Sequence, residues 1–295
     1  MKKKKIITIT TLILTIVLIA GVGLYANKAL SPTSPVKESK TTQEESQEVS
    51  DKDTETNTEE ESFSPFKELS KEFKEAIQST VSLFTSEERH IVAIGDSLTQ
   101  GVGDNSEQGG YVGILDKHLN ADKQVVTFEN YGKRGNRSDQ LLKRLNDPEI
   151  AESITTADIV IITIGANDIM QVLKENFTNI TYEAFSKERG NYEQRLQQIF
   201  KKLNELNPEA SVYLVGFYNP FEQYFNYIKE LDMIVDDWNN TSKQIAEENG
   251  ATFIPTKDLF MSTEEVNLFA DDHFHPNSYG YQLMAKRILN YLVVD

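Results

Sequence analysis

The stretch HIVAIGDSL, residues 90–98, decides the fold, because a short apolar run ends at Gly95 and passes directly into a polar turn that holds Asp96 and Ser97. Apolar runs of this length, without polar alternation, are typical of strands that are buried on both faces of a parallel sheet. Four further runs of the same kind follow along the chain, at residues 124–130, 158–165, 211–217 and 251–255.

Segments with helical periodicity separate these runs, with apolar residues recurring at steps of three or four. They cover residues 111–119, 138–145, 191–206 and 224–248, and a last helix follows Pro276. Alternating strands and helices predict an α/β fold, a three-layer α/β/α sandwich around a five-stranded parallel sheet. In such a sheet ligands bind beyond the carboxyl ends of the strands, so we expect the catalytic groups there.

Composition narrows the chemistry that is open to the protein. The formal net charge of −16 argues against nucleic acid as a partner, because the phosphate backbone requires basic groups. The chain contains no cysteine, which excludes disulfides, thiolate metal sites and a cysteine nucleophile. Hydroxyl, carboxylate and imidazole groups remain, and we expect neither a metal nor an organic cofactor.

The first 26 residues form a segment of their own. The basic cluster at residues 2–5 precedes 21 residues, 6–26, that carry no charge. A helix of that length crosses a hydrocarbon core of about 30 Å, and the lysines place its N-terminal end in the cytoplasm. We expect a single membrane anchor, with a cleavable signal peptide ending near Ala26 or Ala29 as the alternative. In both cases the catalytic part lies outside the cytoplasm, tethered or secreted.

Two connecting segments follow the anchor. Residues 27–61 hold four lysines, ten acidic residues and almost nothing apolar, which predicts a disordered acidic linker. Residues 62–88 predict an amphipathic helix that starts at Ser64 and Pro65 and precedes the main domain, residues 89–295. Its apolar stripe indicates core packing, with a stalk or a dimer contact as the alternative: Phe66, Leu69, Phe73, Ile77, Val81 and Phe84.

A serine hydroxyl such as that of Ser97 needs an adjacent histidine, which a carboxylate normally orients, to act as a nucleophile. Of the four histidines, His90 lies at the start of the first strand, at the wrong end of the sheet, and His118 has no acid at suitable spacing. His275 has Asp272 three residues before it, close enough for the carboxylate to reach Nδ1 and leave Nε2 facing Ser97. A polar loop that caps the last helix is the alternative interpretation.

Acyl transfer also requires hydrogen-bond donors for the negative charge that develops on the carbonyl oxygen. The turn after the second strand, residues 130–138, contains glycines whose backbone N–H could approach a substrate closely. After the third strand, Asn167 carries a side-chain amide that can donate. Either segment alone could be an ordinary turn.

These motifs together resemble the SGNH hydrolases, also called GDSL-type esterases and lipases, over roughly residues 89–292. The stretch 95–98 resembles the first block of that family, 165–168 resembles the third, and Asp272 and His275 resemble its Asp-x-x-His block. The resemblance implies a flavodoxin-like fold, a Ser97–His275–Asp272 triad, and an oxyanion hole made by Ser97 N–H, Gly135 N–H and the Asn167 side chain.

The substrate is predicted only as a class. We expect a serine esterase or lipase that cleaves small, lipid or acylated-glycan esters. The alternatives are an acetyl esterase or O-acetyltransferase on cell-wall polysaccharide and, more remotely, a non-catalytic binding module. Aromatic residues after the fourth strand could line an acyl groove, stack on sugars or fill the core: Phe217, Tyr218, Phe221, Tyr224, Phe225 and Tyr227. Residues 170–190 are expected to form a long connection that could act as a lid.

Overall fold

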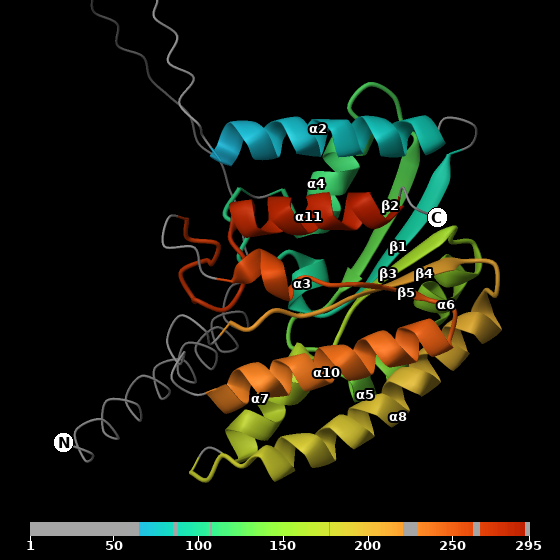
Figure 1. The fold of residues 1–295 in the computed structure, drawn as a ribbon. Coiled ribbons are helices and arrows are strands. Elements are labelled where there is room, and N and C mark those ends of the chain that lie inside the picture. Colours follow the sequence, from blue (N-terminus) through green and yellow to red (C-terminus); the bar gives the residue numbers. More distant parts are fainter. Residues whose placement is uncertain are drawn as a thin grey trace, which may run out of the picture. The chain divides into compact units, whose positions relative to one another are not determined.

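Five parallel strands form a single sheet in the order β2-β1-β3-β4-β5 (Figure 1). They are β1 (Arg89–Gly95), β2 (Val126–Gly132), β3 (Ile159–Thr163), β4 (Ser211–Val215) and β5 (Thr252–Ile254). This order is that of flavodoxin-like doubly wound folds, and it reverses direction between β1 and β3. The predicted fold class is confirmed, including the number of strands and their parallel pairing.

The computed structural model describes residues 65–84, 88–106, 108–176, 178–220, 229–261 and 266–292. The predicted anchor, residues 1–26, and the predicted linker, residues 27–61, therefore lie outside the described residues. Within the described ranges, none of the helices combines the length and the apolar character that crossing a membrane requires. The sheet and its helices, the first of them from Glu68 onward, belong to a compact unit, Glu68–Asp295.

Each face of the sheet is covered by its own layer of helices, because successive strand residues point to opposite faces. In β1, Ile91 and Ala93 belong to one apolar cluster, and Val92 and Ile94 belong to the other. Figure 1 shows the first face under α2 (Pro65–Phe84), α4 (Gly110–Leu119) and α11 (Ser278–Leu292). The second face packs against α5 (Ser138–Arg144), α7 (Ala166–Glu175), α8 (Tyr182–Leu206) and α10 (Lys229–Glu248).

Helix α2 packs on the first face through the last four residues of its apolar stripe, and the side chains of Phe66 and Leu69 lie outside the described ones. Phe84 is buried, and Phe73, Ile77 and Val81 contact the core cluster of this face. The Phe73 ring meets the His118 ring of α4 edge to face, with centroids 5.2 Å apart. These contacts agree with the core-packing interpretation of the stripe, and they give His118 a packing role.

The segment between β3 and β4 differs from the sequence prediction. Instead of a long connection over residues 170–190, α7 continues to Glu175 and α8 begins at Tyr182, so Gly190 lies inside a helix. The burial of Phe185 and Tyr192 on either side of Gly190 outweighs the weak helix propensity of glycine. The prediction of a long connection over residues 170–190, on which the lid was based, is therefore wrong.

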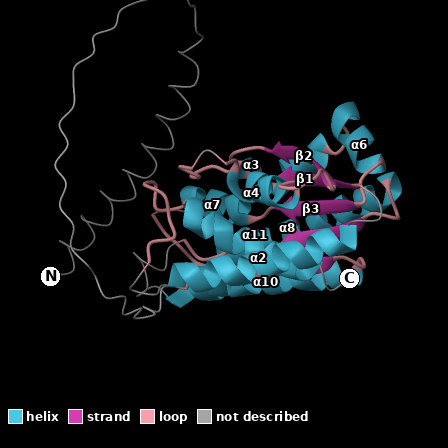
Figure 2. Ribbon diagram, turned by 90° about the horizontal axis from the view of Figure 1, so that it is seen from above, coloured by secondary structure: helices cyan, strands magenta, loops and turns pink. Residues whose placement is uncertain are grey.

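Three short elements were not predicted, because segments of four to eight residues carry little periodic signal. They are α3 (Ser97–Gln100), α6 (Pro148–Thr155) and the 3-10 helix η1 (Lys257–Phe260). Figure 2 shows α3 at one end of the sheet and α6 at the other. Because α3 directly follows β1, it lies at the carboxyl edge of the strands.

Candidate active site

The carboxyl ends of the three strands at the topological switch lie at the same level. Gly95, the last residue of β1, pairs with Gly132 of β2 and with Thr163 of β3, which are the last residues of those strands. The segments that carry Ser97, Gly135 and Asn167 therefore start from one edge. This is the edge at which doubly wound sheets bind ligands.

Ser97 is the first residue of α3, and hydrogen bonds fix the turn that precedes it. The Asp96 backbone N–H donates to the Thr163 carbonyl over 3.1 Å, and the Asp96 carboxylate caps α3 by accepting from Leu98 N–H at 3.0 Å. The Thr163 hydroxyl donates to the same carboxylate oxygen over 2.8 Å. Burial raises the pKa of Asp96 to about 6, although these two bonds and the nearby His275 oppose the rise.

His275 joins Ser97 to Asp272. Its Nε2 lies 2.9 Å from Ser97 Oγ and its Nδ1 lies 2.5 Å from Asp272 Oδ2. The other Asp272 oxygen accepts from the backbone N–H groups of Phe274 and His275, at 3.0 and 2.9 Å. Burial alone would raise the pKa of Asp272, but the bonds from His275 and Phe274 outweigh it and lower the pKa to about 2. The carboxylate is therefore charged whenever the protein is folded near neutral pH.

The loop that carries Asp272 and His275 is held against the core. Ala270 N–H donates to the His275 carbonyl over 2.8 Å, and the Tyr218 hydroxyl donates to the Phe274 carbonyl over 2.8 Å. Tyr218 in turn stacks on Phe260, with ring centroids 4.0 Å apart. Tyr218 and Phe217 are therefore core residues, whereas residues 221–228, with the rest of the predicted aromatic segment, lie outside the described ones.

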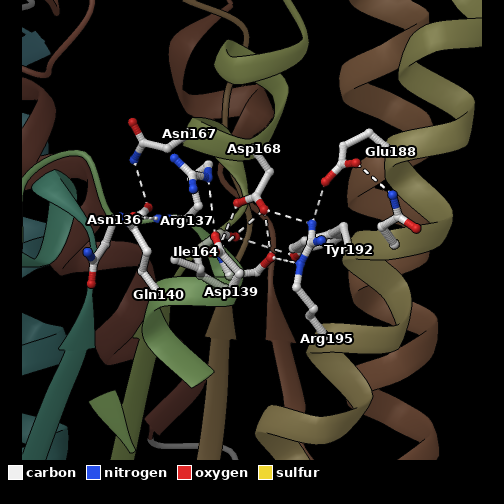
Figure 3. A network of polar contacts seen from close by, with 12 residues as sticks. Asn136, Arg137, Asp139, Gln140, Ile164, Asn167, Asp168, Glu188, Tyr192 and Arg195 are labelled. Carbon is white, nitrogen blue, oxygen red and sulfur yellow. Dashed lines mark hydrogen bonds and ion pairs between the residues drawn. The ribbon is translucent and has the colours of Figure 1, made fainter. Parts of the chain in front are cut away.

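The two predicted oxyanion segments are in contact with each other. Gly135 is exposed and has a φ of 78°, in the left-handed region that glycine tolerates best. The next residue, Asn136, offers its carbonyl oxygen to the Asn167 side-chain amide at 3.0 Å (Figure 3). The structure thus brings Asn167 beside the turn that contains Gly135, and their role as donors stays a prediction.

Four polar residues at this edge were given no role by sequence reasoning: Arg144, Asp168, Ser138 and Arg195. Arg144 of α5 donates to the Asn136 side chain at 2.8 Å and to the Tyr131 carbonyl at 2.7 Å, which ties the Gly135 turn to the end of β2. Asp168 is only 1% exposed and bonds to Ser138 and Arg195. Asp168 and Ser138 stand within the quoted motifs, but Arg195 sits in a long helix with no local signal.

The remaining histidines have other surroundings. His90 Nδ1 lies 3.2 Å from the Thr156 hydroxyl, which follows α6 at the amino end of the sheet, as its position in the sequence predicts. Over the described ranges, no group of three or more His, Cys, Asp or Glu side chains is arranged to hold a metal ion. The absence of a cofactor stays a prediction.

A histidine that bridges a serine hydroxyl and a carboxylate is the arrangement that serine hydrolases use on several unrelated folds. Residues 93–283 match the model of the GDSL-like Lipase/Acylhydrolase family. This match covers more than half of the chain, so the protein belongs to that family and is an ester hydrolase.

Individual relatives agree with this family. YpmR of Bacillus subtilis is 40% identical over 210 residues, which cover 69% of this chain and 82% of YpmR. The spore germination lipase LipC of Bacillus licheniformis is 31% identical over 201 residues, 66% of this chain and 92% of LipC. Among solved structures, the lipase Lip_vut3 from a goat rumen metagenome is similar with a TM-score of 0.60 at 26% identity, covering 68% of this chain and 95% of its own.

Proposed function

We propose that the protein hydrolyses carboxylic esters through an acyl-enzyme on Ser97. The observation that carries this proposal is the continuous chain from Asp272 Oδ2 through His275 to Ser97 Oγ, with separations of 2.5 and 2.9 Å. With Nδ1–H donating to Asp272, His275 Nε2 is left to accept the serine proton. Asp272 then stabilises the imidazolium that forms.

The reaction consists of two acyl transfers. Ser97 Oγ attacks the ester carbonyl carbon while its proton moves to His275 Nε2, and the tetrahedral oxyanion faces Ser97 N–H, Gly135 N–H and the Asn167 amide. The bond to the leaving oxygen then breaks as Nε2 returns the proton to it, which releases the alcohol. Water attacks the acyl-enzyme by the same route, and the acid leaves with Ser97 regenerated.

We test this role with Ser97→Ala in the full-length protein, solubilised in detergent. Turnover of short p-nitrophenyl esters should fall by a factor of about 10⁴ or more, because the nucleophile is lost while the fold stays. A fluorophosphonate probe should label the wild type and not the variant, and circular dichroism checks that both are folded. Wild-type turnover in the variant would disprove the assignment.

For the substrate, we infer lipid-type acyl esters in preference to acetyl groups. The support comes from LipC and Lip_vut3, whose names describe them as lipases. Rates on p-nitrophenyl acetate, octanoate and palmitate, and acetate release from acetylated cell-wall glycans, separate the two possibilities. A preference for octanoate or palmitate is expected, whereas a preference for acetate and acetylated glycans would favour the acetyl esterase instead.

We also propose that the enzyme acts outside the cytoplasm. The support is the sequence of residues 2–26, in which four lysines precede 21 uncharged residues. Proteinase K added to intact spheroplasts that express the full-length chain should digest the hydrolase domain, whereas a cytoplasmic control protein stays intact. Protection of the domain until the spheroplasts are lysed would contradict this placement.

A further inference from the structure

Asp168 is a buried carboxylate that the proposed reaction does not use. It is only 1% exposed, and it follows Asn167 in the first turn of α7. Burial raises the pKa of Asp168, and bonds from Ser138 together with the charge of Arg195 oppose that rise. A group that is costly to bury needs partners, and these come from two other helices.

The side chains of Asp168, Ser138 and Arg195 form a closed ring, and Figure 3 shows Asp168 and Arg195 beside each other. Asp168 Oδ1 accepts from the Ser138 hydroxyl at 2.6 Å and from Arg195 Nη2 at 3.1 Å. Arg195 Nε closes the ring by donating to Ser138 Oγ at 2.6 Å. The second oxygen, Oδ2, accepts from Ser138 backbone N–H at 3.0 Å. The carboxylate therefore accepts hydrogen bonds from both the side chain and the main chain of Ser138, the first residue of α5.

Arg195 is itself held in place by a further acid. Its Nη2 donates to Glu188 Oε1 over 2.6 Å, and Glu188 lies seven residues, about two helical turns, earlier in α8. The guanidinium therefore has carboxylates on two sides, Asp168 and Glu188. Charge-assisted bonds of this kind are shorter and stronger than neutral ones, which makes the ring a stiff connection between α5, α7 and α8.

The ring joins the two segments that carry the oxyanion donors of the proposed function. Asp168 directly follows Asn167, and Ser138 lies three residues after Gly135. Asn167 also reaches across to the Asn136 carbonyl at 3.0 Å, but that bond is made by the donor side chain itself. The geometry of the Asn167–Asn136 bond depends on the backbone positions of both segments. Asp168 links these segments, because its carboxylate accepts from the backbone N–H of Ser138.

We propose that Asp168, with Ser138 and Arg195, is a positioning residue that sets the separation between the Gly135 N–H and the Asn167 amide. Preorganised donors stabilise an oxyanion without any cost of rearrangement during the reaction. Displacement of a catalytic group by about 1 Å can cost about 100-fold in rate. This inference rests on the proposed function, because it assigns Asp168 to the donors of that reaction.

The test uses Asp168→Asn and Ser138→Ala in the full-length protein. Both variants keep Ser97, His275 and Asp272. Asp168→Asn removes the negative charge that accepts the hydrogen bonds from α5, and Ser138→Ala removes the hydroxyl that closes the ring. We expect kcat on p-nitrophenyl octanoate to fall about 10- to 100-fold with KM within a factor of two. The second measurement is the affinity for an alkyl trifluoromethyl ketone. Ser97 Oγ adds to the carbonyl of this inhibitor, and the resulting hemiketal carries an oxyanion. This affinity should fall by the same factor as kcat.

The matched control is Asp158→Asn. Asp158 also links separate parts of the sheet, since its carboxylate accepts from His90 N–H at 2.7 Å and from Arg89 at 3.0 Å, but it lies at the amino end. This variant should lose stability and keep both kcat and inhibitor affinity. A structural role alone would leave the ratio of inhibitor affinity to KM unchanged in all three variants.

The outcomes separate this proposal from the one on which it rests. If Asp168→Asn and Ser138→Ala keep kcat and inhibitor affinity within a factor of two while Ser97→Ala is inactive, the positioning role is overturned and the triad stands. If Ser97→Ala is fully active, the proposed function itself fails. Should Asp168→Asn not fold, the smaller change in Ser138→Ala decides the question.

Discussion

His275 Nε2 lies 2.9 Å from Ser97 Oγ, although 178 residues separate them in the chain. The serine begins α3, two residues after the first strand ends, and the histidine stands in the loop before the last helix. The strand order places both at one edge of the sheet, and bonds from Ala270 and Tyr218 hold the histidine loop there. The contact between Ser97 and His275 is therefore a product of the whole fold.

The first prediction concerns the orientation of His275. Asp272→Asn keeps the size of the side chain but removes the charge that holds Nδ1–H, so the imidazole can adopt the wrong tautomer. We expect kcat to fall by about 10⁴, with a small change in KM. Steady-state kinetics on a p-nitrophenyl ester measures this effect. The neighbouring exposed residue provides the control, because Asp271→Asn should keep full activity.

The second prediction concerns the pH dependence of stability. Asp96 has a folded pKa of about 6 against an ordinary value of 3.8, so between these pH values the folded state keeps a proton that the unfolded state releases. Stability falls as pH rises through this window, by about 3 kcal/mol in total. Asp96→Asn has no proton to lose, so its stability relative to the wild type should increase from pH 4 to pH 7.

Urea unfolding at both pH values measures this difference. Asp272 contributes in the opposite direction, because its lowered pKa of about 2 gives stability that is lost only below pH 3.8. That contribution is the same in both proteins, and it changes outside the window. A constant difference between wild type and Asp96→Asn across the window would show that the buried carboxyl does not titrate there.

The third prediction concerns the support under α3. A Cβ on Gly132 would lie 2.1 Å from Gln100 N and 2.5 Å from Thr99 C, both backbone atoms of α3. Gly132→Ala must therefore displace the helix that begins with Ser97. We expect a loss of stability of about 1–3 kcal/mol together with a clear loss of kcat. Chemical denaturation and kinetics at 25 °C measure the two effects separately.

The fourth prediction provides a variant of similar stability without a catalytic effect. Phe73→Ala removes the half-buried ring that α2 packs against His118, which should cost about 2 kcal/mol. The contact lies on a helix that carries none of the proposed catalytic groups, so kcat should stay unchanged. If Phe73→Ala lowers kcat as much as Gly132→Ala does, the activity loss in both would reflect stability alone.

The fifth prediction tests the extent of α8. Gly190 lies inside this helix, and a Cβ there meets no atom within 4 Å. Gly190→Ala should therefore stabilise the protein by about 0.5–1 kcal/mol, because alanine loses less conformational freedom in a helix. A thermal melt gives the sign. Destabilisation would mean that residues 182–190 are not helical in solution.

The sequence by itself determined the parallel α/β sheet and the pairing of Asp272 with His275. Runs of β-branched residues without polar alternation are typical of parallel strands that are buried on both faces. The inner strands β1 and β3 agree with this, whereas the edge strands β2 and β5 are partly exposed. An acid three residues before a histidine can reach it within one turn. Both signals are local, so no knowledge of the packing was needed. Local signals gave a wrong prediction between β3 and β4, where the helix was expected to start after Gly190. It begins at Tyr182 instead, because the buried rings of Phe185 and Tyr192 stabilise the helix on both sides of Gly190.

Only the tertiary structure decided which distant groups meet at the edge of the sheet. Arg195 lies in the middle of a 25-residue helix, and nothing in its neighbourhood distinguishes it from other surface arginines until α8 packs beside α5 and α7. The pKa of Asp96 likewise depends on burial by the surrounding strands and helices. Contacts of this kind arise when whole helices and strands pack against one another. The periodicity of the sequence indicates the type of each element, but it does not indicate which distant elements will be neighbours.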